Sequence, residues 1–415
     1  MKPVETDFLI IGGGLTGLMC ALHLHRHRKD YILVEAAGRV GGRVWTDFQD
    51  GFLLDRGFQV YLDSYDQGIP YLDLTKLDVG YFSTGAYIQG SSGRSYFGDP
   101  LREPSSLLST LISSAASPLD KWKLFRLAQS LKQKSDEEIW SAPEVPTAAF
   151  LRSLGFSQKV QHGFLAPFFG GVFLDDSLGV SSRLFQFLYK RFALGRACLP
   201  RQGMAAIPQQ LFRQLDPQRI LLHQQVAGLE GCEIKTESGM KLRGRHVLCA
   251  MDQPSAFSLM GWRLEKTHSR STRVYYFATE ENPFLDRPAL LLNGNPEGPI
   301  RHMSFPSLVQ PSYAPTGWHL VSVTTRNDIS GHVTEMNEKT IALKAGEAFD
   351  INTHHWNFLR SYHVLHGLPI MASMSGPGFM EIREGVWLAG DYLTYPSING
   401  AFQSANQLAS HLLAD

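Results

Sequence analysis

The chain has 415 residues, of which 43% are hydrophobic and 19% charged, a composition typical of globular proteins. Lysine plus arginine and aspartate plus glutamate both total 39, so no basic excess favours binding to nucleic acid. The length exceeds one ordinary domain and predicts two or three.

The cysteines and the N-terminus indicate the compartment. The start "MKPVETD" leads directly into an apolar strand pattern and leaves no room for a signal peptide or an Arg-rich transit sequence. No apolar run approaches the roughly 20 residues that cross a bilayer. The cysteines form neither a CxxC pair nor a metal-spaced set, which favours a reducing, cytoplasmic compartment and argues against a zinc site. They are Cys20, Cys198, Cys232 and Cys249.

A glycine-rich turn follows the first predicted strand. Phe8 to Ile11 is a continuous apolar run, as expected for a strand buried in a parallel sheet, and a helical pattern follows the turn. In such a unit the first glycine allows the tight turn, the second lets a pyrophosphate approach the backbone, and the third lets the helix pack closely. A glycine-rich turn without a ligand is the alternative. We expect dinucleotide binding by Gly12, Gly14, Leu15, Thr16 and Gly17.

The second predicted strand, "YILVE", ends in Glu35, 18 residues after Gly17. An acid at this distance accepts hydrogen bonds from the ribose hydroxyls of an adenine dinucleotide. NAD and FAD share this half-site, so other segments must distinguish them.

A second glycine doublet follows in "AAGRVGGRVW", where Arg39 and Arg43 flank Gly42. An arginine beside such a doublet can bind a pyrophosphate through two parallel hydrogen bonds, although a polar surface loop is the alternative. In "LLDRGFQVY", Gly57 interrupts a strand-like pattern, which commonly marks a close approach of the backbone to another group.

The C-terminal segment predicts one more strand and a helix. "VWLAGD" reads as a strand that ends in Gly390 and Asp391, and "SINGAFQSANQLASHLL" reads as a terminal helix. Ser397 and Asn399 are suitable N-cap residues for that helix.

Together, the second glycine doublet, the segment around Gly57 and the C-terminal segment resemble the amine oxidase, phytoene desaturase and protoporphyrinogen oxidase superfamily of FAD flavoproteins. The resemblance implies that Arg43 and its glycines bind pyrophosphate, and that Gly390 and Asp391 contact the phosphates and ribityl chain. It also implies that the last helix directs its N-terminus, at Ile398 and Asn399, toward the flavin ring. A nicotinamide enzyme would not require this C-terminal element, so the resemblance indicates FAD.

Two central segments add to this resemblance, which runs from residue 7 to residue 413. "LPRQGMAAIPQQL" is similar to a family P-x-G-G-M step, with Gln202 where a glycine often stands. It implies that the backbone of Val226 packs against the adenine. "WNFLRSYHVLHGLP" resembles the family segment that precedes the last strand.

The resemblance implies an α/β fold: a Rossmann-type FAD-binding domain of the glutathione reductase-like, amine oxidase type, with an inserted α+β substrate domain. We expect the FAD-binding domain to comprise residues 1–70, 199–262 and 375–415, and the substrate domain residues 71–198 and 263–374. In the latter, "TRVYYFA", "PALLLN" and "HLVSVTT" predict strands of an antiparallel sheet, and "EKTIALKAGEAF" predicts a helix.

Two patterns in the first substrate segment leave alternatives open. Eight aromatic residues between 164 and 192 predict either the lining of an apolar cavity or an ordinary helical core. They are Phe164, Phe168, Phe169, Phe173, Phe185, Phe187, Tyr189 and Phe192. "SPLDKWKLFRLAQSLKQK" is amphipathic and basic, which fits peripheral contact with a membrane or, as the neighbouring "DEE" favours, a solvated helix face.

The expected reaction is removal of a hydride from a C–H bond of a small, largely apolar substrate, with the flavin reoxidised by oxygen, a quinone or another acceptor. No cysteine follows Cys249, so we expect FAD to be bound non-covalently. No motif around Lys266 matches the lysine that many amine oxidases place near the flavin, which favours a desaturase-like dehydrogenation. A flavin amine oxidase, an isomerase or mutase without net oxidation, and a non-catalytic FAD-binding protein stay open.

No catalytic side chain can be assigned from these patterns. Tyr362, Tyr392 and Tyr395 are candidates for the substrate face, with core packing as the alternative. The histidine pairs at 354–355 and at 363 and 366 lack carboxylate or cysteine partners at suitable spacing, so we expect no metal site.

Overall fold

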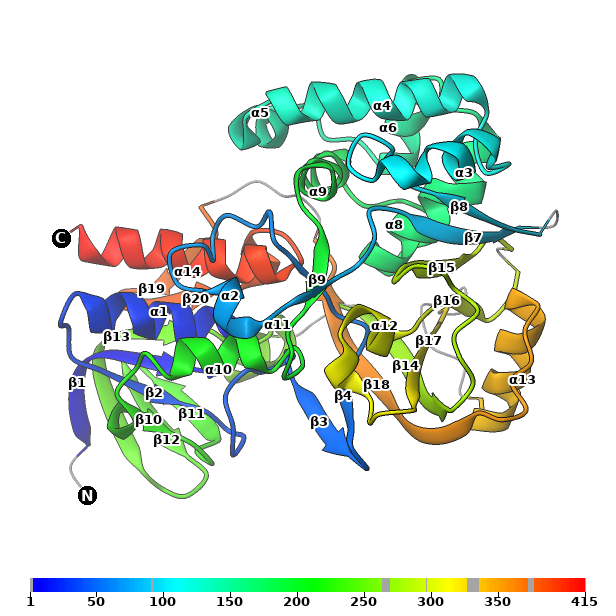
Figure 1. Ribbon diagram of the computed structural model, residues 1–415. Coiled ribbons are helices and arrows are strands. Elements are labelled where there is room, and N and C mark those ends of the chain that lie inside the picture. Colours follow the sequence, from blue (N-terminus) through cyan, green and yellow to red (C-terminus); the bar gives the residue numbers. More distant parts are fainter. Residues whose placement is uncertain are drawn as a thin grey trace.

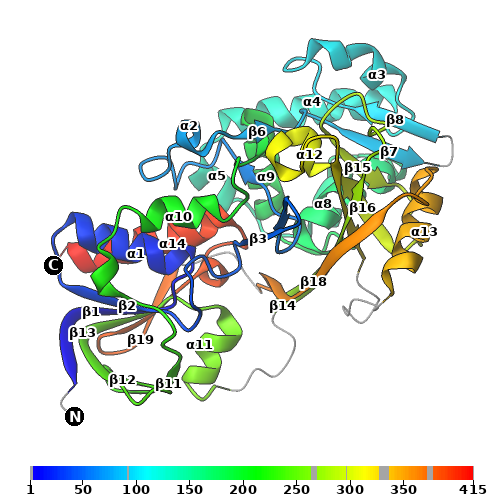
Figure 2. The ribbon, with the colours of Figure 1, turned by 60° about the horizontal axis from the view of Figure 1, so that its bottom comes forward.

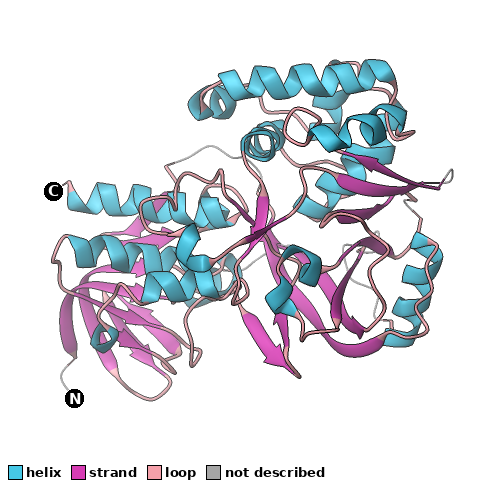
Figure 3. Cartoon of the chain, in the orientation of Figure 1, coloured by secondary structure: helices cyan, strands magenta, loops and turns pink. Residues whose placement is uncertain are grey.

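The molecule contains two large β-sheets, and several segments of the chain pass between them (Figures 1 and 3). The computed structural model describes residues 3–90, 93–262, 269–295, 297–326, 336–371 and 377–414. Within this part of the chain, no helix is both long enough and apolar enough to cross a membrane.

The first sheet has eight strands around a parallel core in the order β10-β2-β1-β13, with β20 beside the C-terminal half of β13. The antiparallel strands β12 and β19 extend it next to β13 and β20, and β11 pairs with β12. The bounds are β1 Val4–Ile11, β2 Tyr31–Val34, β10 Ile220–Leu221, β11 Val226–Glu230, β12 Glu233–Thr236, β13 Lys241–Cys249, β19 Phe379–Arg383 and β20 Val386–Ala389. The predicted apolar strands are therefore present, and the central ones are buried on both faces.

Helices cover both faces of this sheet. On one face α1 (Leu15–Arg26) packs against α10 (Ala206–Phe212) and α14 (Ile398–Leu413), so helices from the beginning, middle and end of the chain lie side by side (Figures 1 and 2). α11 (Gln253–Leu259) packs near β11. Sequentially distant segments thus build one unit.

The second sheet has seven strands in the order β18-β14-β17-β16-β15-β7-β8. Its pairs are antiparallel except β15 with β7, so the expectation of an antiparallel sheet is wrong at this pair. The reason is that β7 comes from residues before 198 and β15 from residues after 263; no hairpin connects them. The bounds are β7 Ala86–Gly90, β8 Gly93–Phe97, β14 Ser269–Thr279, β15 Leu290–Asn293, β16 Ile300–Ser304, β17 His319–Thr325 and β18 Asn357–Pro369.

The two faces of the second sheet meet different partners. One face packs against α13 (Glu338–Phe349), the predicted helix, through Tyr275, Met303 and Val323. α8 (Ala166–Phe173) contacts β15 and β16, and the short α12 (Pro306–Val309) contacts β17.

A helical cap lies beyond the second sheet, at the top of Figure 1. Its longest helix, α4, begins with a capping box in which Ser117 and Asp120 satisfy each other's backbone N–H groups. α4, α5 and α6 all contact α9, and α3 contacts β8. The bounds are α3 Leu107–Ile112, α4 Pro118–Gln133, α5 Asp136–Ser141, α6 Thr147–Ser153, α7 Gln158–Val160, the π-helical η2 Gln161–Leu165, α8 Ala166–Phe173 and α9 Ser182–Leu194.

Short elements connect the two sheets. The hairpin of β3 and β4 is followed by a turn in which Gly57 has φ +105°, so the predicted strand-like segment is split between β4 and β5. β9 pairs with β5 and β6. Further bounds are β3 Thr46–Gln49, β4 Phe52–Asp55, β5 Tyr61–Leu62, α2 Leu74–Leu77, β6 Gly80–Tyr81, β9 Ala197–Leu199, and the 3-10 turns η1 Pro104–Ser106, η3 Pro217–Arg219, η4 Pro311–Tyr313 and η5 Asp391–Leu393.

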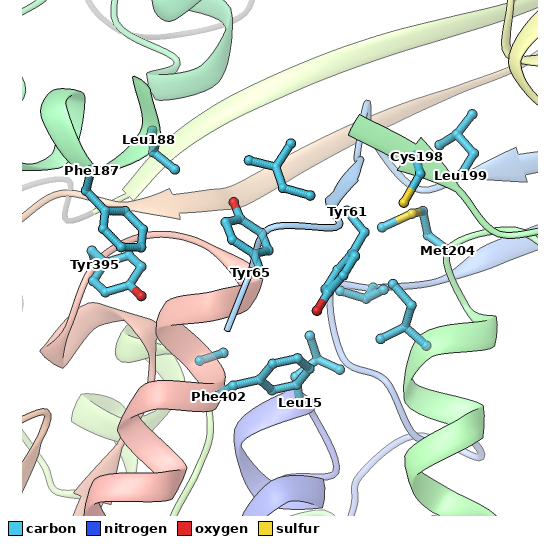
Figure 4. Close-up of a cluster of buried hydrophobic side chains, with 14 of the residues drawn as sticks. Leu15, Tyr61, Tyr65, Phe187, Leu188, Cys198, Leu199, Met204, Tyr395 and Phe402 are labelled. Carbon is cyan, nitrogen blue, oxygen red and sulfur yellow. The ribbon is translucent and has the colours of Figure 1, made fainter. Parts of the chain in front are cut away.

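A continuous apolar core joins α1, α14, α9 and β9 (Figure 4). The Tyr395 ring packs against Phe187 of α9 in a tilted arrangement, with ring centroids 4.9 Å apart, and Phe402 and Leu15 face the same cluster from α14 and α1. The C-terminal helix is therefore held by both the first sheet and the helical cap.

Candidate cofactor and substrate site

One large cavity, of about 1390 Å³, is bordered by the motif loops of the first sheet, by the second sheet and by the helical cap. Sites for a single small ligand typically measure about 300–1,000 Å³. The volume therefore allows a dinucleotide and a second ligand to bind together.

The glycine-rich turn borders this cavity at Gly12 and Gly14, and each glycine has a separate structural reason. Gly12 has φ +105°, and a Cβ there would lie 2.8 Å from the carbonyl oxygen of Ala250. A Cβ on Gly14 would meet nothing within 4 Å, so this backbone is open to the cavity. A Cβ on Gly17 would overlap the carbonyl oxygen of Gly12, so Gly17 allows α1 to pack against the turn.

The N-terminus of α1 also faces the cavity, through Leu15 and Thr16. Its first-turn N–H groups have no partners within the helix, no side chain caps it at Gly14, and no acid stands in its first turn. The positive end of the helix dipole is therefore not neutralised by a neighbouring carboxylate of the helix, which suits a bound phosphate. The Thr16 hydroxyl donates to the carbonyl oxygen of Ala401 at 3.2 Å and ties α1 to α14.

Glu35 directly follows β2 and borders the cavity. Its Oε2 accepts from the backbone N–H of Gly13 at 2.6 Å, and its Oε1 accepts from Ala37 at 2.8 Å. These two bonds fix the carboxylate beside the glycine-rich turn. Val226, at the start of β11, lies on the same cavity wall.

The second glycine doublet meets the end of β20. Arg43 donates from Nη2 to Asp391 Oδ1 at 2.7 Å and from Nη1 to the carbonyl oxygen of Gly367 at 3.1 Å. Gly42 has φ +57°, and a Cβ there would lie 3.3 Å from Gly14 Cα. Arg43, Gly42, Asp391 and its neighbour Gly390 all border the cavity, as does Gly57.

The N-terminus of α14 lies at the same cavity. Ile398 borders it, and the Ser397 side chain caps the helix by accepting from Gly400 at 2.9 Å. Asn399 is fully buried instead, where it donates to Asp66 at 3.0 Å and to the Tyr395 hydroxyl at 2.9 Å. The side chain of Asn399 thus holds the helix in place.

Twelve of the fifteen predicted cofactor residues border the cavity, and Gly17, Arg39 and Asn399 do not. Arg39 lies over the Trp45 ring at 4.1 Å and donates to the carbonyl oxygen of Gly42 at 3.4 Å. Arg39 therefore supports the loop of the second glycine doublet on the side away from the cavity. Gln202, in the position of a family glycine, is exposed.

The three tyrosine candidates for the substrate face do not border the cavity. Tyr392 and Tyr395 are buried, and the Tyr362 hydroxyl donates to Asp47 at 2.8 Å. Lys266 lies outside the described residues. Among the described residues, no group of three or more histidine, cysteine, aspartate or glutamate side chains is placed to hold a metal ion.

The far half of the cavity is an apolar chamber. Five of the eight predicted aromatics line it, whereas Phe173, Phe185 and Phe187 belong to the core, so both interpretations of that pattern apply. The five are Phe164, Phe168, Phe169, Tyr189 and Phe192.

One face of the second sheet forms the floor of this chamber. A row of side chains from six strands borders the cavity: Ala86, Leu290, His302, Thr324, Thr272 and Val364. Sequence patterns do not distinguish this row, because β14, β16 and β17 are buried along almost their whole length and show no alternation that would indicate the cavity side. Burial and, to a smaller extent, the charges of Arg301 and Arg326 together lower the pKa of His302 to about 3, so its imidazole is neutral at pH 7.

The cavity extends to the surface of the helical cap. Leu101, Leu111, Lys121, Phe125 and Lys132 border it there, from α3, α4 and the preceding loop. The basic amphipathic helix predicted from the sequence is α4, and it forms part of this end of the cavity.

Comparison with known proteins identifies the family. The family model of flavin containing amine oxidoreductases matches residues 15–413. Coproporphyrinogen III oxidase of Bacillus subtilis is 39% identical over 69 residues, 15% of either chain, and protoporphyrinogen oxidase 2 of Arabidopsis thaliana is 24% identical over 176 residues, 42% of this chain and 34% of the relative. This chain thus spans well under two thirds of the length of these curated relatives.

A solved structure shows the same fold over nearly the whole chain. An oxidoreductase from Methanosarcina mazei superposes with a TM-score of 0.72 over 97% of this chain and 100% of that chain, at 18% identity. The expected mixed α/β fold, with a Rossmann-like sheet and a separate second sheet, is confirmed. The chain belongs to the flavin containing amine oxidoreductase family and is an FAD-dependent oxidoreductase.

Proposed function

We propose that this protein binds FAD non-covalently and removes a hydride from a C–H bond of a largely apolar substrate in the apolar chamber. When bound, FAD supplies the hydride acceptor and is reoxidised by oxygen, a quinone or another acceptor. The protein's own residues bind the two molecules, orient them and exclude water.

The cofactor site in this proposal runs along the first sheet. Glu35 accepts from the ribose hydroxyls, the N-terminus of α1 and Arg43 hold the pyrophosphate, and Val226 packs on the adenine. The N-terminus of α14 stabilises negative charge that develops on the flavin ring during the reaction. The residues proposed to contact FAD are Gly12, Gly14, Leu15, Thr16, Glu35, Gly42, Arg43, Gly57, Val226, Gly390, Asp391 and Ile398. Gly17, Arg39 and Asn399 support this FAD-binding site from positions outside the cavity wall.

Two structural features support non-covalent binding and this division of the chain. None of the four cysteines borders the cavity, and Cys20, Cys198 and Cys249 are buried in the core. The strands of the first sheet fall within residues 1–70, 199–262 and 375–415, and those of the second within 71–198 and 263–374. We keep these ranges as the proposed FAD-binding and substrate domains.

The single observation that carries the substrate class is the lining of the chamber. It is aromatic and aliphatic, and among the described residues of its cap and second-sheet walls the one carboxylate is Asp99, whose charge acts on the nearby Arg102. A buried ammonium group requires a paired anion or an aromatic cage with compensating charge. The lining therefore favours oxidation of an apolar substrate over oxidation of an amine, which is the alternative.

A surface at the cap end of the cavity supports a lipophilic substrate. We define the cap patch as the eight large apolar side chains between residues 101 and 125 that are 47% to 74% exposed: Leu101, Leu107, Leu108, Leu111, Ile112, Leu119, Trp122 and Phe125. Lys121 and Lys132 stand among them at the cavity border, and Arg126 lies over the Trp122 ring.

The occupant that we propose for the cap patch is the surface of an anionic lipid bilayer. Apolar side chains interspersed with lysine and arginine match the interfacial region of such a bilayer in both polarity and charge. Because the cavity reaches this patch, a lipophilic substrate could pass from the membrane into the chamber without crossing water. A cytoplasmic location with peripheral membrane contact is thus part of the proposal.

An anaerobic screen tests the proposed reaction. The purified holoprotein is mixed with a polyene, a porphyrinogen or an amine, and the visible flavin absorbance is recorded. Bleaching by a polyene or porphyrinogen supports the proposal, and bleaching by amines alone, with hydrogen peroxide released in air, replaces it with the amine alternative. Turnover without net acceptor consumption indicates an isomerase. A flavin that no ligand reduces indicates a non-catalytic binding protein.

A further inference from the structure

His302 and Thr324 lie opposite each other on neighbouring strands in the floor of the apolar chamber. They are register partners of β16 and β17, and a β-bulge between Ile300 and His302 precedes this pair. Both border the cavity, and both are at least 98% buried. Bulges commonly redirect a side chain toward a functional site.

The polar atoms of this pair lack hydrogen-bond partners. Among the described residues, no group forms a hydrogen bond with either imidazole nitrogen of His302 or with the hydroxyl oxygen of Thr324. A buried polar atom without a partner costs about 1–3 kcal/mol, so native proteins retain few of them. Two adjacent residues with this property, both on the wall of one cavity, point to a ligand that completes their hydrogen bonds.

The charges behind the pair restrict which ligand group can bind there. Arg301 and Arg326 share one carboxylate, Asp176, with Arg326 Nη1 3.2 Å from Asp176 Oδ2. This local excess of positive charge, together with burial, keeps the His302 imidazole neutral and opposes a substrate ammonium group at the same place. A neutral imidazole offers one donor and one acceptor, and the threonine hydroxyl offers both.

We propose that His302 and Thr324 form a subsite that binds an uncharged oxygen function, a hydroxyl or a carbonyl, of a largely apolar substrate. This inference rests on the proposed function and narrows its substrate class: an apolar molecule that carries at least one neutral oxygen. The pair fixes how the molecule lies along the floor, and its apolar remainder contacts the aromatic side chains of the cap.

Two neighbours determine access to the imidazole. Phe58 packs edge-on against it, with ring centroids 4.7 Å apart, and itself borders the cavity. Gly171 of α8 lies on another side, where a Cβ would be 3.2 Å from His302 Nδ1. Phe58 is partly exposed, so it is the side chain that an incoming ligand displaces to reach the ring nitrogens.

Three pyrene probes of similar shape test the subsite on the holoprotein, without turnover. The probes are 1-pyrenemethanol, 1-methylpyrene and 1-pyrenemethylammonium, and dissociation constants are obtained from pyrene fluorescence. His302→Phe and Thr324→Val remove the polar atoms while keeping the shape. Ser304→Ala is the matched control, because its buried hydroxyl also lacks a described partner but does not border the cavity.

We expect wild type to bind 1-pyrenemethanol and to bind the ammonium probe most weakly. His302→Phe and Thr324→Val each weaken the binding of 1-pyrenemethanol by about three- to tenfold, which is the effect of one lost hydrogen bond. The dissociation constant of 1-methylpyrene changes by less than about twofold. Ser304→Ala changes neither. FAD content and the thermal midpoint are recorded for each variant, and Thr324→Val carries the test if His302→Phe fails to fold.

The outcomes separate the two proposals. If 1-methylpyrene binds and the variants change both neutral probes equally or not at all, the subsite is wrong while the apolar chamber stands. If the ammonium probe binds wild type most tightly, both the subsite and the apolar substrate class are wrong. If no pyrene probe binds, the chamber does not admit apolar ligands, and both proposals fail.

Discussion

Arg43 and Asp391 are 348 residues apart in the chain, and their side chains form an ion pair with Nη2 2.7 Å from Oδ1. The carboxylate is nearly buried and the guanidinium is about one-third exposed. The pair joins the second glycine doublet to the residues that follow β20. The relative position of these two segments, which both belong to the proposed pyrophosphate site, therefore depends on the pair.

The first prediction concerns this pair. Arg43→Met leaves the Asp391 carboxylate buried without its partner, which costs about 1–3 kcal/mol of unfolding free energy. We expect a lower thermal midpoint and less FAD per mole of purified protein. Arg201→Met is the control, because the Arg201–Asp78 pair is more than half exposed on both sides and contributes about 0–1 kcal/mol. Equal losses in the two variants would contradict the role of the Arg43 pair.

The second prediction compares two glycines of one turn. Gly14→Ala adds a methyl group that meets no protein atom within 4 Å, so we expect normal folding. The same methyl group occupies the space proposed for the pyrophosphate, so FAD affinity falls by roughly tenfold or more, equivalent to about 1.4 kcal/mol. Gly17→Ala forces α1 away from Gly12 and lowers the thermal midpoint of the apoprotein. Apoprotein melting and FAD titration measure the two effects separately, and a Gly14→Ala variant with unchanged FAD affinity would refute the assignment.

The third prediction tests the ribose contact. Glu35→Ala removes the carboxylate at the cavity wall and weakens FAD retention, while Glu35→Gln retains one acceptor oxygen and is less affected. The flavin absorbance per mole of protein after dialysis measures this difference. Glu5→Ala, an exposed change on β1, is the control. A Glu35→Ala protein that is isolated fully yellow would falsify the ribose assignment.

The fourth prediction concerns Asp55, a fully buried carboxyl between the sheets. Burial raises its pKa from 3.8 to about 6, although it accepts hydrogen bonds from Thr46 at 2.5 Å, Met204 at 3.0 Å and Tyr313 at 2.8 Å. Because the folded pKa is the higher one, the contribution of Asp55 to stability is complete below pH 3.8 and is lost as the pH rises through about 6. The difference between the two pKa values corresponds to about 3 kcal/mol.

Asp55→Asn removes this titration and keeps an oxygen for Met204. We therefore expect the thermal midpoint of the variant, relative to wild type, to rise steadily from about pH 4 to about pH 7. Differential scanning of both proteins at matched pH values gives this difference directly and cancels the titration of other groups. A difference that is constant with pH would show that Asp55 titrates at its ordinary value.

The fifth prediction tests the cap patch. A Leu108→Ser/Ile112→Ser protein loses two of its most exposed apolar side chains, and we expect about a hundredfold or greater loss of binding to vesicles that contain phosphatidylglycerol, since burying each such side chain contributes about 1.5–3 kcal/mol. Leu343→Ser is the matched control, because Leu343 is 58% exposed but lies on α13. Vesicle co-sedimentation measures binding at low and high salt. Similar binding by wild type and the double variant would exclude the bilayer as the occupant of this patch.

The parts of the fold that local patterns specify were predictable from the sequence. The glycine-rich turn with Glu35, the strand that ends before Gly390, and the helix over residues 338–349 are all present. Their signals are turn chemistry, apolar runs and helical spacing, which depend on neighbours in the chain. The parallel pairing of β15 with β7 was not predictable in this way, because it joins segments about 200 residues apart and no connecting turn specifies it.

The lining of the apolar chamber was even less predictable from the sequence. His302 stands in a strand whose five residues are all buried, so no alternation of polar and apolar positions distinguishes it from core. Phe169 borders the cavity and Phe185 does not, yet both belong to one aromatic-rich segment and their rings pack 4.7 Å apart. Which side chains reach a cavity is decided by how distant elements pack, and a single sequence carries little direct record of that packing.

β13 has a consequence for biosynthesis. It pairs with β1, which begins at Val4, and with β20, which ends at Ala389, so the parallel sheet is complete only after residue 389 has left the ribosome. Until residue 391 has emerged, Arg43 lacks its partner and one edge of β13 is unpaired. A nascent or truncated chain that ends before residue 391 therefore lacks part of the proposed flavin site, and we expect cofactor binding only after this segment has been synthesised.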